Sequence, residues 1–184
     1  MAAIISMNER NGISPGTVTQ NIPQISWKMV DDSTTPYSSY SSAISLGLNS
    51  YTKYVYLVFT GQFTNISNVA ITYVSGNLLP GVQLMSSPSL SLDSPLPSYA
   101  TPTSADIGLT NNISAIGSSV NLLVGPIGSS SDPATAPNKL VTCNNDPVTG
   151  MLVSSYFITQ LLTTKYSSTG VIDSINFQVS FNST

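Results

Sequence analysis

The 184-residue chain contains no histidine, a single cysteine and a single glutamate, and only 7% of its residues are charged. Without histidine, the Ser-His-Asp and Cys-His catalytic arrangements and most zinc and iron sites are excluded. The lone Cys143 cannot form an internal disulfide, and such a residue is usually a buried or incidental thiol. We therefore expect no metal site and no bound cofactor.

Long hydrophobic runs are also missing. No apolar stretch approaches the roughly 20 residues that a membrane-spanning helix needs. Residues 1–12 place a short apolar patch before their charges, which is the wrong order for a signal peptide, and the patch is too short. The sequence thus predicts no membrane partner.

The scarcity of charge favours assembly. Charged residues make up 7% of the chain, against about 25% in ordinary soluble domains, and Ser, Thr and Asn supply the polarity instead. Copies of such a chain can approach one another without charge repulsion, which suits a lattice or fibre and a homo-oligomer. A net charge of −3 argues against nucleic-acid binding, which needs clustered basic residues. The basic residues are scattered: Arg10, Lys28, Lys53, Lys139 and Lys165.

The acidic residues predict no catalytic pair. Glu9 is close to the N-terminus, and most of the remaining acids lie in turn-like or Pro-flanked loops, where Asp usually caps or braces the turn. A pair for glycoside hydrolysis would have to come from Asp93, Asp106, Asp132, Asp146 and Asp173. Asp31 and Asp32 lack the further oxygen ligands of a calcium loop, so a solvated turn is the better interpretation. We expect a protein that is not an enzyme.

The segment 53–76 gives the strongest structural signal. It begins with Tyr-Val-Tyr-Leu-Val-Phe at 54–59, which is apolar on both alternating faces and is typical of a central strand covered on both sides. Gly61 interrupts the run. Apolar residues then recur between polar ones up to Tyr73, which predicts a half-buried return strand. We expect the two strands to pair in the middle of an antiparallel sheet.

Further strands are predicted on both sides of this pair. The patterns indicate strands at 17–30, 43–48, 82–85 and 120–124, and a closing hairpin formed by 151–163 and 175–181. No stretch has a helical period. The fold class is therefore all-β, an antiparallel β-sandwich of the jelly-roll or Ig-like kind. Trp27 is assigned to its core, with a sugar-stacking surface as the alternative.

The domain plan is simple. We expect residues 1–16 to form an extended N-terminal arm and residues 17–184 to form a single β-sandwich domain. Two long loop excursions, 86–119 and 125–150, are rich in Pro, Ser and Thr and too broken for long regular elements. Loops of this length inside a compact domain are often functional, so we interpret them as ordered segments that reach a partner.

Three parts of the chain have an unusual sequence: GQFTNISN at 61–68, the loop YATPT at 99–103 with an acidic residue shortly after it, and a late pair of strands that ends in INFQVSF at 175–181. In this order they resemble a family of small virion proteins from tailed bacteriophages. The resemblance covers most of residues 49–181. It implies a structural protein that is made in the host cytoplasm and incorporated into the virion.

The resemblance and the composition together predict a non-enzymatic capsid decoration or cement protein that bridges neighbouring capsid subunits. Its partners would be copies of itself and a major capsid or other virion protein. An alternative is a tail, neck or fibre component, and another is a carbohydrate-binding module with Trp27, Tyr37, Tyr40 or Tyr99 stacking on sugars. The residues predicted to contact a partner lie in the arm and the first long loop: Ile4, Ile5, Met7, Leu96, Tyr99 and Pro102.

Overall fold

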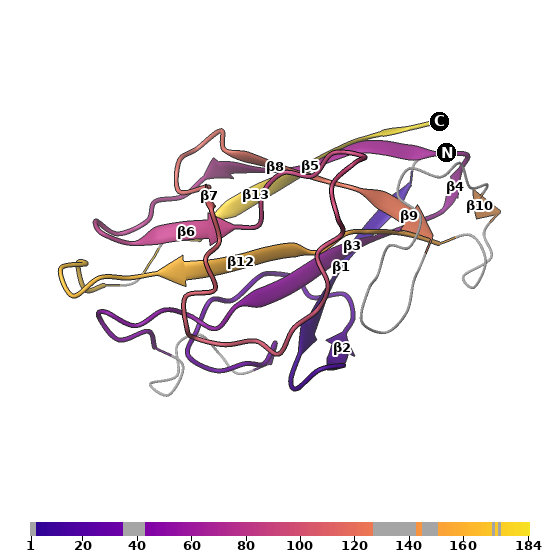
Figure 1. The fold of residues 1–184 in the computed structure, drawn as a ribbon. Coiled ribbons are helices and arrows are strands. Elements are labelled where there is room, and N and C mark those ends of the chain that lie inside the picture. The colour runs from indigo at the N-terminus through magenta and orange to yellow at the C-terminus, as the bar shows by residue number, and fades with distance from the viewer. Residues whose placement is uncertain (1–2, 35–42, 127–142, 145–150, 171, 173) are drawn as a thin grey trace.

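A computed structural model describes residues 3–34, 43–126, 143–144, 151–170, 172 and 174–184 (Figure 1). The described residues form strands and no helix, which confirms the predicted all-β class. The strands are β1 (Ile4–Asn11), β2 (Thr17–Thr19), β3 (Lys53–Thr60), β4 (Gln62–Phe63), β5 (Ile66–Ser75), β6 (Gln83–Ser86), β7 (Asn111–Asn112), β8 (Ser119–Leu122), β9 (Val124–Pro126), β10 (Cys143–Asn144), β11 (Leu152–Ser154), β12 (Phe157–Leu162) and β13 (Asn176–Ser183).

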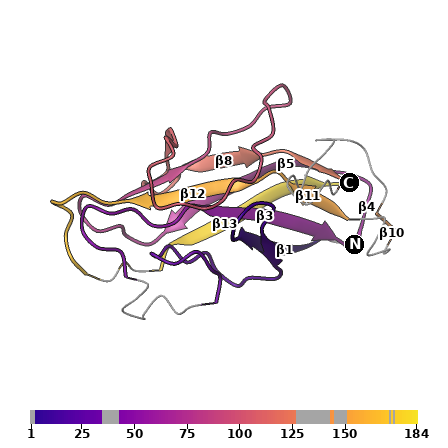
Figure 2. The same ribbon diagram turned by 60° about the horizontal axis from the view of Figure 1, so that its bottom comes forward.

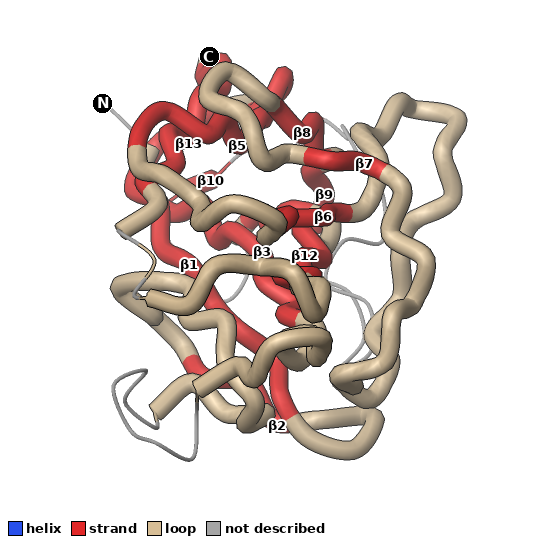
Figure 3. The backbone as a smooth tube through the Cα atoms, turned by 90° about the vertical axis from the view of Figure 1, so that its left-hand side faces the viewer, coloured by secondary structure: helices blue, strands red, loops and turns tan. Residues whose placement is uncertain are grey.

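The strands make an antiparallel sandwich of two main sheets. The larger sheet has the order β2-β1-β3-β12-β6-β7, with β11 between β3 and β9, and the smaller has the order β13-β5-β8. A short β10-β4 ladder stands apart from both. Figure 3 looks along the sandwich and shows the two layers one above the other, with β13 and β1 on the same side. Both termini lie at the end that carries β4 and β10 (Figures 1 and 2).

Strand β3 has a core on each of its faces, as its sequence predicts. Leu57 and Phe59 point between the sheets and pack with apolar residues of β5, β8 and β12. Tyr54, Tyr56 and Val58 point the other way, into a second cluster that the loop after β6 covers. Every residue of Lys53–Phe59 is consequently buried, and β3 is the strand on which both clusters are built.

The predicted pairing of β3 with β5 is wrong. The two strands lie in different sheets, because the chain turns at Gly61, whose φ of 111° favours glycine, and crosses to the facing layer through β4. The predicted hairpin of the last strands is wrong for the same reason: β12 belongs to the larger sheet and β13 pairs with β5. Strands that are neighbours in one sheet and strands that face each other across a core have the same alternation of apolar residues, so the pattern does not distinguish the two arrangements.

The expected arm is also different from the structure. Residues 4–11 form β1, which pairs with β3 from Ile4 opposite Thr60 to Arg10 opposite Tyr54. Of the strand expected at 17–30 only Thr17–Thr19 forms, and 43–48 is irregular. The loop at 86–119 is largely irregular, with β7 and the start of β8 inside it. Most of the second excursion, 127–142 and 145–150, lies outside the described residues.

Candidate functional site

The first candidate surface is an apolar seam on the side of the sandwich where β1 and β13 run, which we call the side seam. We define it by Ile4, Ile5, Met7, Val179 and Phe181. Ile4 is 65% exposed, and the other four are half-buried against the inner core. The Phe181 ring meets the Phe59 ring at 5.5 Å between centroids. The structure thus places Ile5 and Met7 on the inner face of β1, against the same core as the two residues of the last strand. Ile4, at the start of β1, points to the opposite face of the strand.

Both strands of the side seam have free edges within the described chain. β13 is the outermost strand of its sheet and pairs with β5 only. β2 pairs with β1 only along Glu9–Asn11, and the Met7 carbonyl accepts a hydrogen bond from the Ile22 N–H at 2.8 Å. The free part of this edge is therefore the start of β1, before Met7. The exposed side chains of β13 are uncharged: Asn176, Gln178, Ser180, Asn182 and Ser183. Unguarded edges of this kind favour pairing with another chain.

The residues predicted from the long loop are partly or fully enclosed within the molecule. Tyr99 is only 6% exposed, Pro102 is buried and Leu96 is half-buried. Tyr99 packs edge-on against Tyr54 at 4.9 Å between ring centroids and donates a hydrogen bond to the Gly12 carbonyl. The YATPT loop therefore holds the molecule together internally, with the Tyr99 and Pro102 side chains turned into the molecule.

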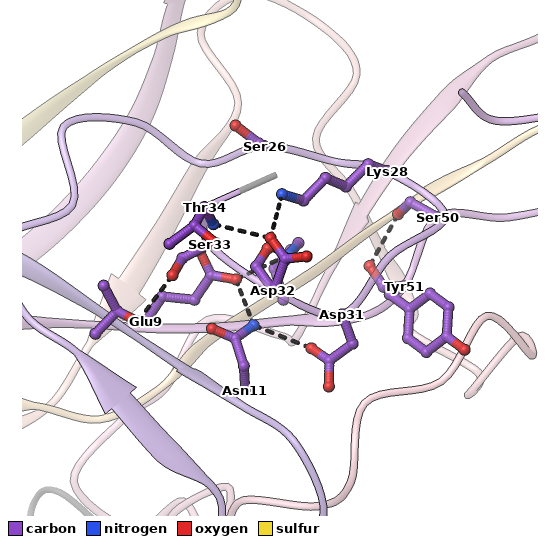
Figure 4. A network of polar contacts seen from close by, with 12 residues as sticks. Glu9, Asn11, Ser26, Lys28, Asp31, Asp32, Ser33, Thr34, Ser50 and Tyr51 are labelled. Atoms are coloured by element: carbon purple, nitrogen blue, oxygen red, sulfur yellow. Dashed lines mark hydrogen bonds and ion pairs between the residues drawn. The ribbon is translucent and has the colours of Figure 1, made fainter. Parts of the chain in front are cut away.

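The polar centre of the molecule is a network at the end of β1 and β3 (Figure 4). Lys53, with no exposed surface, donates a hydrogen bond from Nζ to Glu9 Oε1 at 2.8 Å. Glu9 is 1% exposed. Asn11 Nδ2 donates to the same Glu9 oxygen at 2.7 Å and to Asp31 Oδ1 at 3.0 Å. The network therefore joins β1 and β3 to the segment around residue 31.

A second ion pair extends the network. Lys28, which is fully buried, donates from Nζ to Asp32 Oδ1 at 2.8 Å. The same Asp32 oxygen accepts a hydrogen bond from the Thr34 backbone N–H, and Asp31 Oδ2 accepts one from Gly12 N at 2.8 Å. The two aspartates are half-buried parts of this network, so they brace a turn, as expected, but one that is only partly solvated.

Arg10 connects the network to the second core cluster. Its guanidinium lies 5.6 Å from the centroid of the Tyr99 ring and donates to the Pro15 carbonyl at 3.2 Å. Burial, and secondarily the charge of Asp31, raises the pKa of the Tyr99 hydroxyl above its usual value. The phenol is therefore a neutral hydrogen-bond donor over the whole physiological pH range.

Six of the nine charged residues in the described part of the chain belong to this polar region. The other three charged residues of the described chain are exposed and lie outside the region: Asp93, Asp106 and Lys165. Sequence reasoning missed the network because its members lie in three separate segments. One signal was available: a chain with so few charges has both Glu9-Arg10 and Asp31-Asp32 as adjacent charged pairs.

The described residues contain no group of three metal-ligating side chains. Nor do they contain a helix long and apolar enough to cross a membrane. An open groove lies beside the turn at 76–82, lined by Leu78, Leu79, Pro80, Val82 and Ile116 among others. Its lining contains no Asp or Glu, and the titratable side chain in it is the buried Tyr73, so it offers no pairing of an acid with a nucleophile.

The aromatic residues considered for sugar stacking are placed as follows. The Trp27 ring is half-buried and lies 6.3 Å from the Phe177 ring, and Tyr99 is buried. Tyr37 and Tyr40 lie outside the described residues. Comparisons of the chain with protein-family models, with curated proteins and with solved structures found no match.

Proposed function

We propose that this chain is a non-enzymatic structural protein of a tailed-phage virion that decorates or cements the capsid. The observation that carries the proposal is the character of the surface. In the described part of the chain three charged residues are exposed, against nine large hydrophobic side chains. These are Ile4, Ile13, Leu46, Leu48, Val74, Leu92, Ile107, Ile116 and Tyr166.

A surface of this kind suits permanent contact with other subunits. Charge repulsion does not keep copies apart, and exposed apolar residues lose area to water when they are covered. The free edges of β13 and β1 add unpaired backbone groups that a neighbouring subunit can satisfy. Each such hydrogen bond contributes only about 0.5–1.5 kcal/mol net, but repetition over a lattice multiplies the effect.

The side seam is the part of this surface that we assign to subunit contact. It combines an exposed side chain, Ile4, with half-buried ones that still have apolar area to cover. The buried Tyr99 and Pro102, which were predicted to serve as contacts, are replaced in this role by Val179 and Phe181 of β13. The partners that we propose are copies of the chain and the major capsid protein.

Immunogold labelling of intact virions tests the location. An antibody raised against the recombinant protein is expected to label the head uniformly. Label confined to the tail, the collar or the fibre tips would refute the decoration role and favour a tail, neck or fibre component.

A matched pair of variants tests the surface. Ile4 is 65% exposed and Ile116, in the turn between β7 and β8, is 62% exposed. We expect Ile4→Lys to lower the number of copies retained on purified virions, because the charge must be desolvated at the contact. Ile116→Lys is expected to leave that number unchanged. Equal retention of both variants would exclude the side seam as the contact surface.

A further inference from the structure

Three side chains of the buried network have the arrangement of a reactive site. Glu9 Oε1 lies 2.8 Å from Lys53 Nζ and 2.7 Å from Asn11 Nδ2, so one carboxylate oxygen stands between an amine and the nitrogen of a carboxamide. Lys53 and Glu9 are shielded from water. The β1–β3 register pairs Arg10 with Tyr54, and its next step places Asn11 opposite Lys53. Residues directly opposite on adjacent strands have neighbouring side chains.

We propose that Lys53 and Asn11 form an intramolecular isopeptide bond, with Glu9 as the proton carrier. Glu9 takes a proton from the Lys53 ammonium group, and the neutral Nζ adds to the Asn11 carboxamide carbon. The second proton lost by Nζ passes through Glu9 to Nδ2, the bond between that carbon and Nδ2 breaks, and ammonia leaves. The amide keeps one hydrogen on Nζ, and the released ammonia takes up the remaining proton as ammonium. Nothing is oxidised or reduced.

The geometry supplies a proton carrier in contact with both nitrogens. General acid–base catalysis requires the carboxylate within hydrogen-bond reach of both nitrogens, about 2.6–3.2 Å, and both distances satisfy it. The chain holds the amine and the carboxamide on paired strands, which removes the entropy cost of bringing them together. Burial of Lys53 and Glu9 limits the access of water to the amine and to the proton carrier.

The carboxamide is held by its nitrogen alone. Nδ2 donates to Glu9 and to Asp31 Oδ1, whereas Oδ1 is shielded from solvent and has no hydrogen-bond partner in the described structure. On the other side, Lys53 Nζ also donates to the Asp32 carbonyl at 3.1 Å, which fixes the amine beside Glu9. These contacts orient the leaving nitrogen and the nucleophile toward the same proton carrier.

The chain contains its own control. Lys28 is as deeply buried as Lys53 and also pairs with a carboxylate. The Asp32 oxygen that it binds also accepts a hydrogen bond from the Thr34 backbone N–H, whereas the Glu9 oxygen beside Lys53 accepts one from the Asn11 carboxamide. A reaction that merely followed from a buried lysine beside an acid would occur at both sites.

One competing reaction also releases ammonia. Asn11 precedes Gly12, and attack of the Gly12 nitrogen on the Asn11 side chain would give a cyclic imide of the same mass as the isopeptide product. That nitrogen does not require Lys53, so the two products respond differently to a change at Lys53. The bond that we propose is independent of the virion role, since it depends only on residues within one chain.

Mass spectrometry of the purified full-length protein under denaturing conditions tests the proposal. We expect a mass below that of the sequence by one ammonia, and a branched peptide that joins Asn11 to Lys53. Lys53→Arg, Asn11→Ala and Glu9→Gln are expected to have their full sequence mass, whereas Lys28→Arg should still lose one ammonia.

Three results would overturn the proposal. The first is a wild-type mass equal to that of the sequence, which needs no variant and so does not depend on how a variant folds. The second is an ammonia loss that persists in Lys53→Arg, which identifies the cyclic imide at Asn11. The third is loss of one water in place of ammonia, which identifies a bond between a lysine and a carboxylate.

Discussion

Truncation of Tyr99 to alanine is expected to destabilise the protein strongly, because this residue joins the long loop to the sheet. Its ring packs against Tyr54 and Tyr156, and its hydroxyl bonds the Gly12 carbonyl. Removal of a buried aromatic ring costs about 3–5 kcal/mol, and the lost hydrogen bond adds about 0.5–1.5 kcal/mol. The sum, about 3.5–6.5 kcal/mol, is a large part of the ~5–15 kcal/mol by which native domains are stable, and it should lower Tm by roughly 7–26 °C for a chain of this size.

A double-mutant cycle with Gly16 tests the contact itself. A Cβ at Gly16 would lie 2.8 Å from the Tyr99 ring, and its φ of 72° is unfavourable for other residues. Gly16→Ala alone should therefore cost the clash plus about 1–2 kcal/mol of backbone strain. In the Tyr99→Ala background only the backbone term remains, so the two changes should couple by about 1 kcal/mol or more.

Urea denaturation followed by circular dichroism and calorimetry measures these changes. Tyr166→Ala is the control, because Tyr166 is 83% exposed and such surface changes usually stay within about 0.5 kcal/mol. If Tyr99→Ala lost less than about 1 kcal/mol, or if its effect simply added to that of Gly16→Ala, Tyr99 would not be the internal anchor described above. Contact between the loop at 86–119 and a partner would then be the better interpretation of Tyr99.

Three further changes have definite outcomes. Burial raises the pKa of both Tyr54 and Tyr99 above 10.0, so the unfolded chain loses these protons first and stability should decline above about pH 10. In Tyr99→Phe the decline should be shallower by up to about 1.4 kcal/mol per pH unit, and an unchanged slope in melts at alkaline pH would contradict this. Gln160→Met should lower the free energy of unfolding by about 2–4 kcal/mol, because Nε2 of this fully buried residue donates to three backbone carbonyls. Amide exchange near residue 103 should become faster in this variant, and exchange at the wild-type rate there would argue against the prediction. Gly76→Ala should cost more than about 2 kcal/mol, since its Cβ would meet the Ser174 carbonyl at a φ of 115°; Gly117→Ala, with open space around it, should cost only the backbone term.

The strands were easier to predict than their partners. The run at 54–59 is apolar on both faces, and β3 is indeed covered on both. Periodicity is a property of one strand and its two faces, so it identified β3 and β5 as strands. It contains no information on which strand lies next to which. The crossing at Gly61 depends on the inner faces of β3 and β5 meeting across the core, which only the whole sandwich determines.

The candidate site was predictable in part. Ile5 and Met7 lie at the side seam, as a short apolar segment near the terminus suggested, although in a strand and not in an arm. Tyr99 was assigned to a partner because it lies in a Pro- and Ser-rich loop. Its burial depends on Gly16, whose missing side chain leaves room for the ring. Contacts of this kind, more than 80 positions apart in the sequence, have no local signature.

The buried network explains why β1 takes a single register. Its sequence begins Ile4-Ile5-Ser6-Met7, which offers apolar residues to both faces and therefore specifies the register weakly. Before the proposed cross-link forms, a slip by one residue would turn Glu9 away from Lys53 and leave buried charges without partners, at a cost of several kcal/mol. The charges thus act against the alternative register more than they stabilise the native one.

Paired apolar replacement tests this account of the register. Glu9→Leu with Lys53→Met removes both charges, and such replacements are often neutral or stabilising. We expect the double variant to be about as stable in urea as Asn11→Ala, which also lacks the proposed cross-link but keeps both charges. The amides of β1 should exchange faster in the double variant than in Asn11→Ala, since the slipped pairing is no longer penalised. Equal protection of β1 in the two variants would show that packing of Ile5 and Met7 against Phe59 and Leu57 is sufficient to set the register.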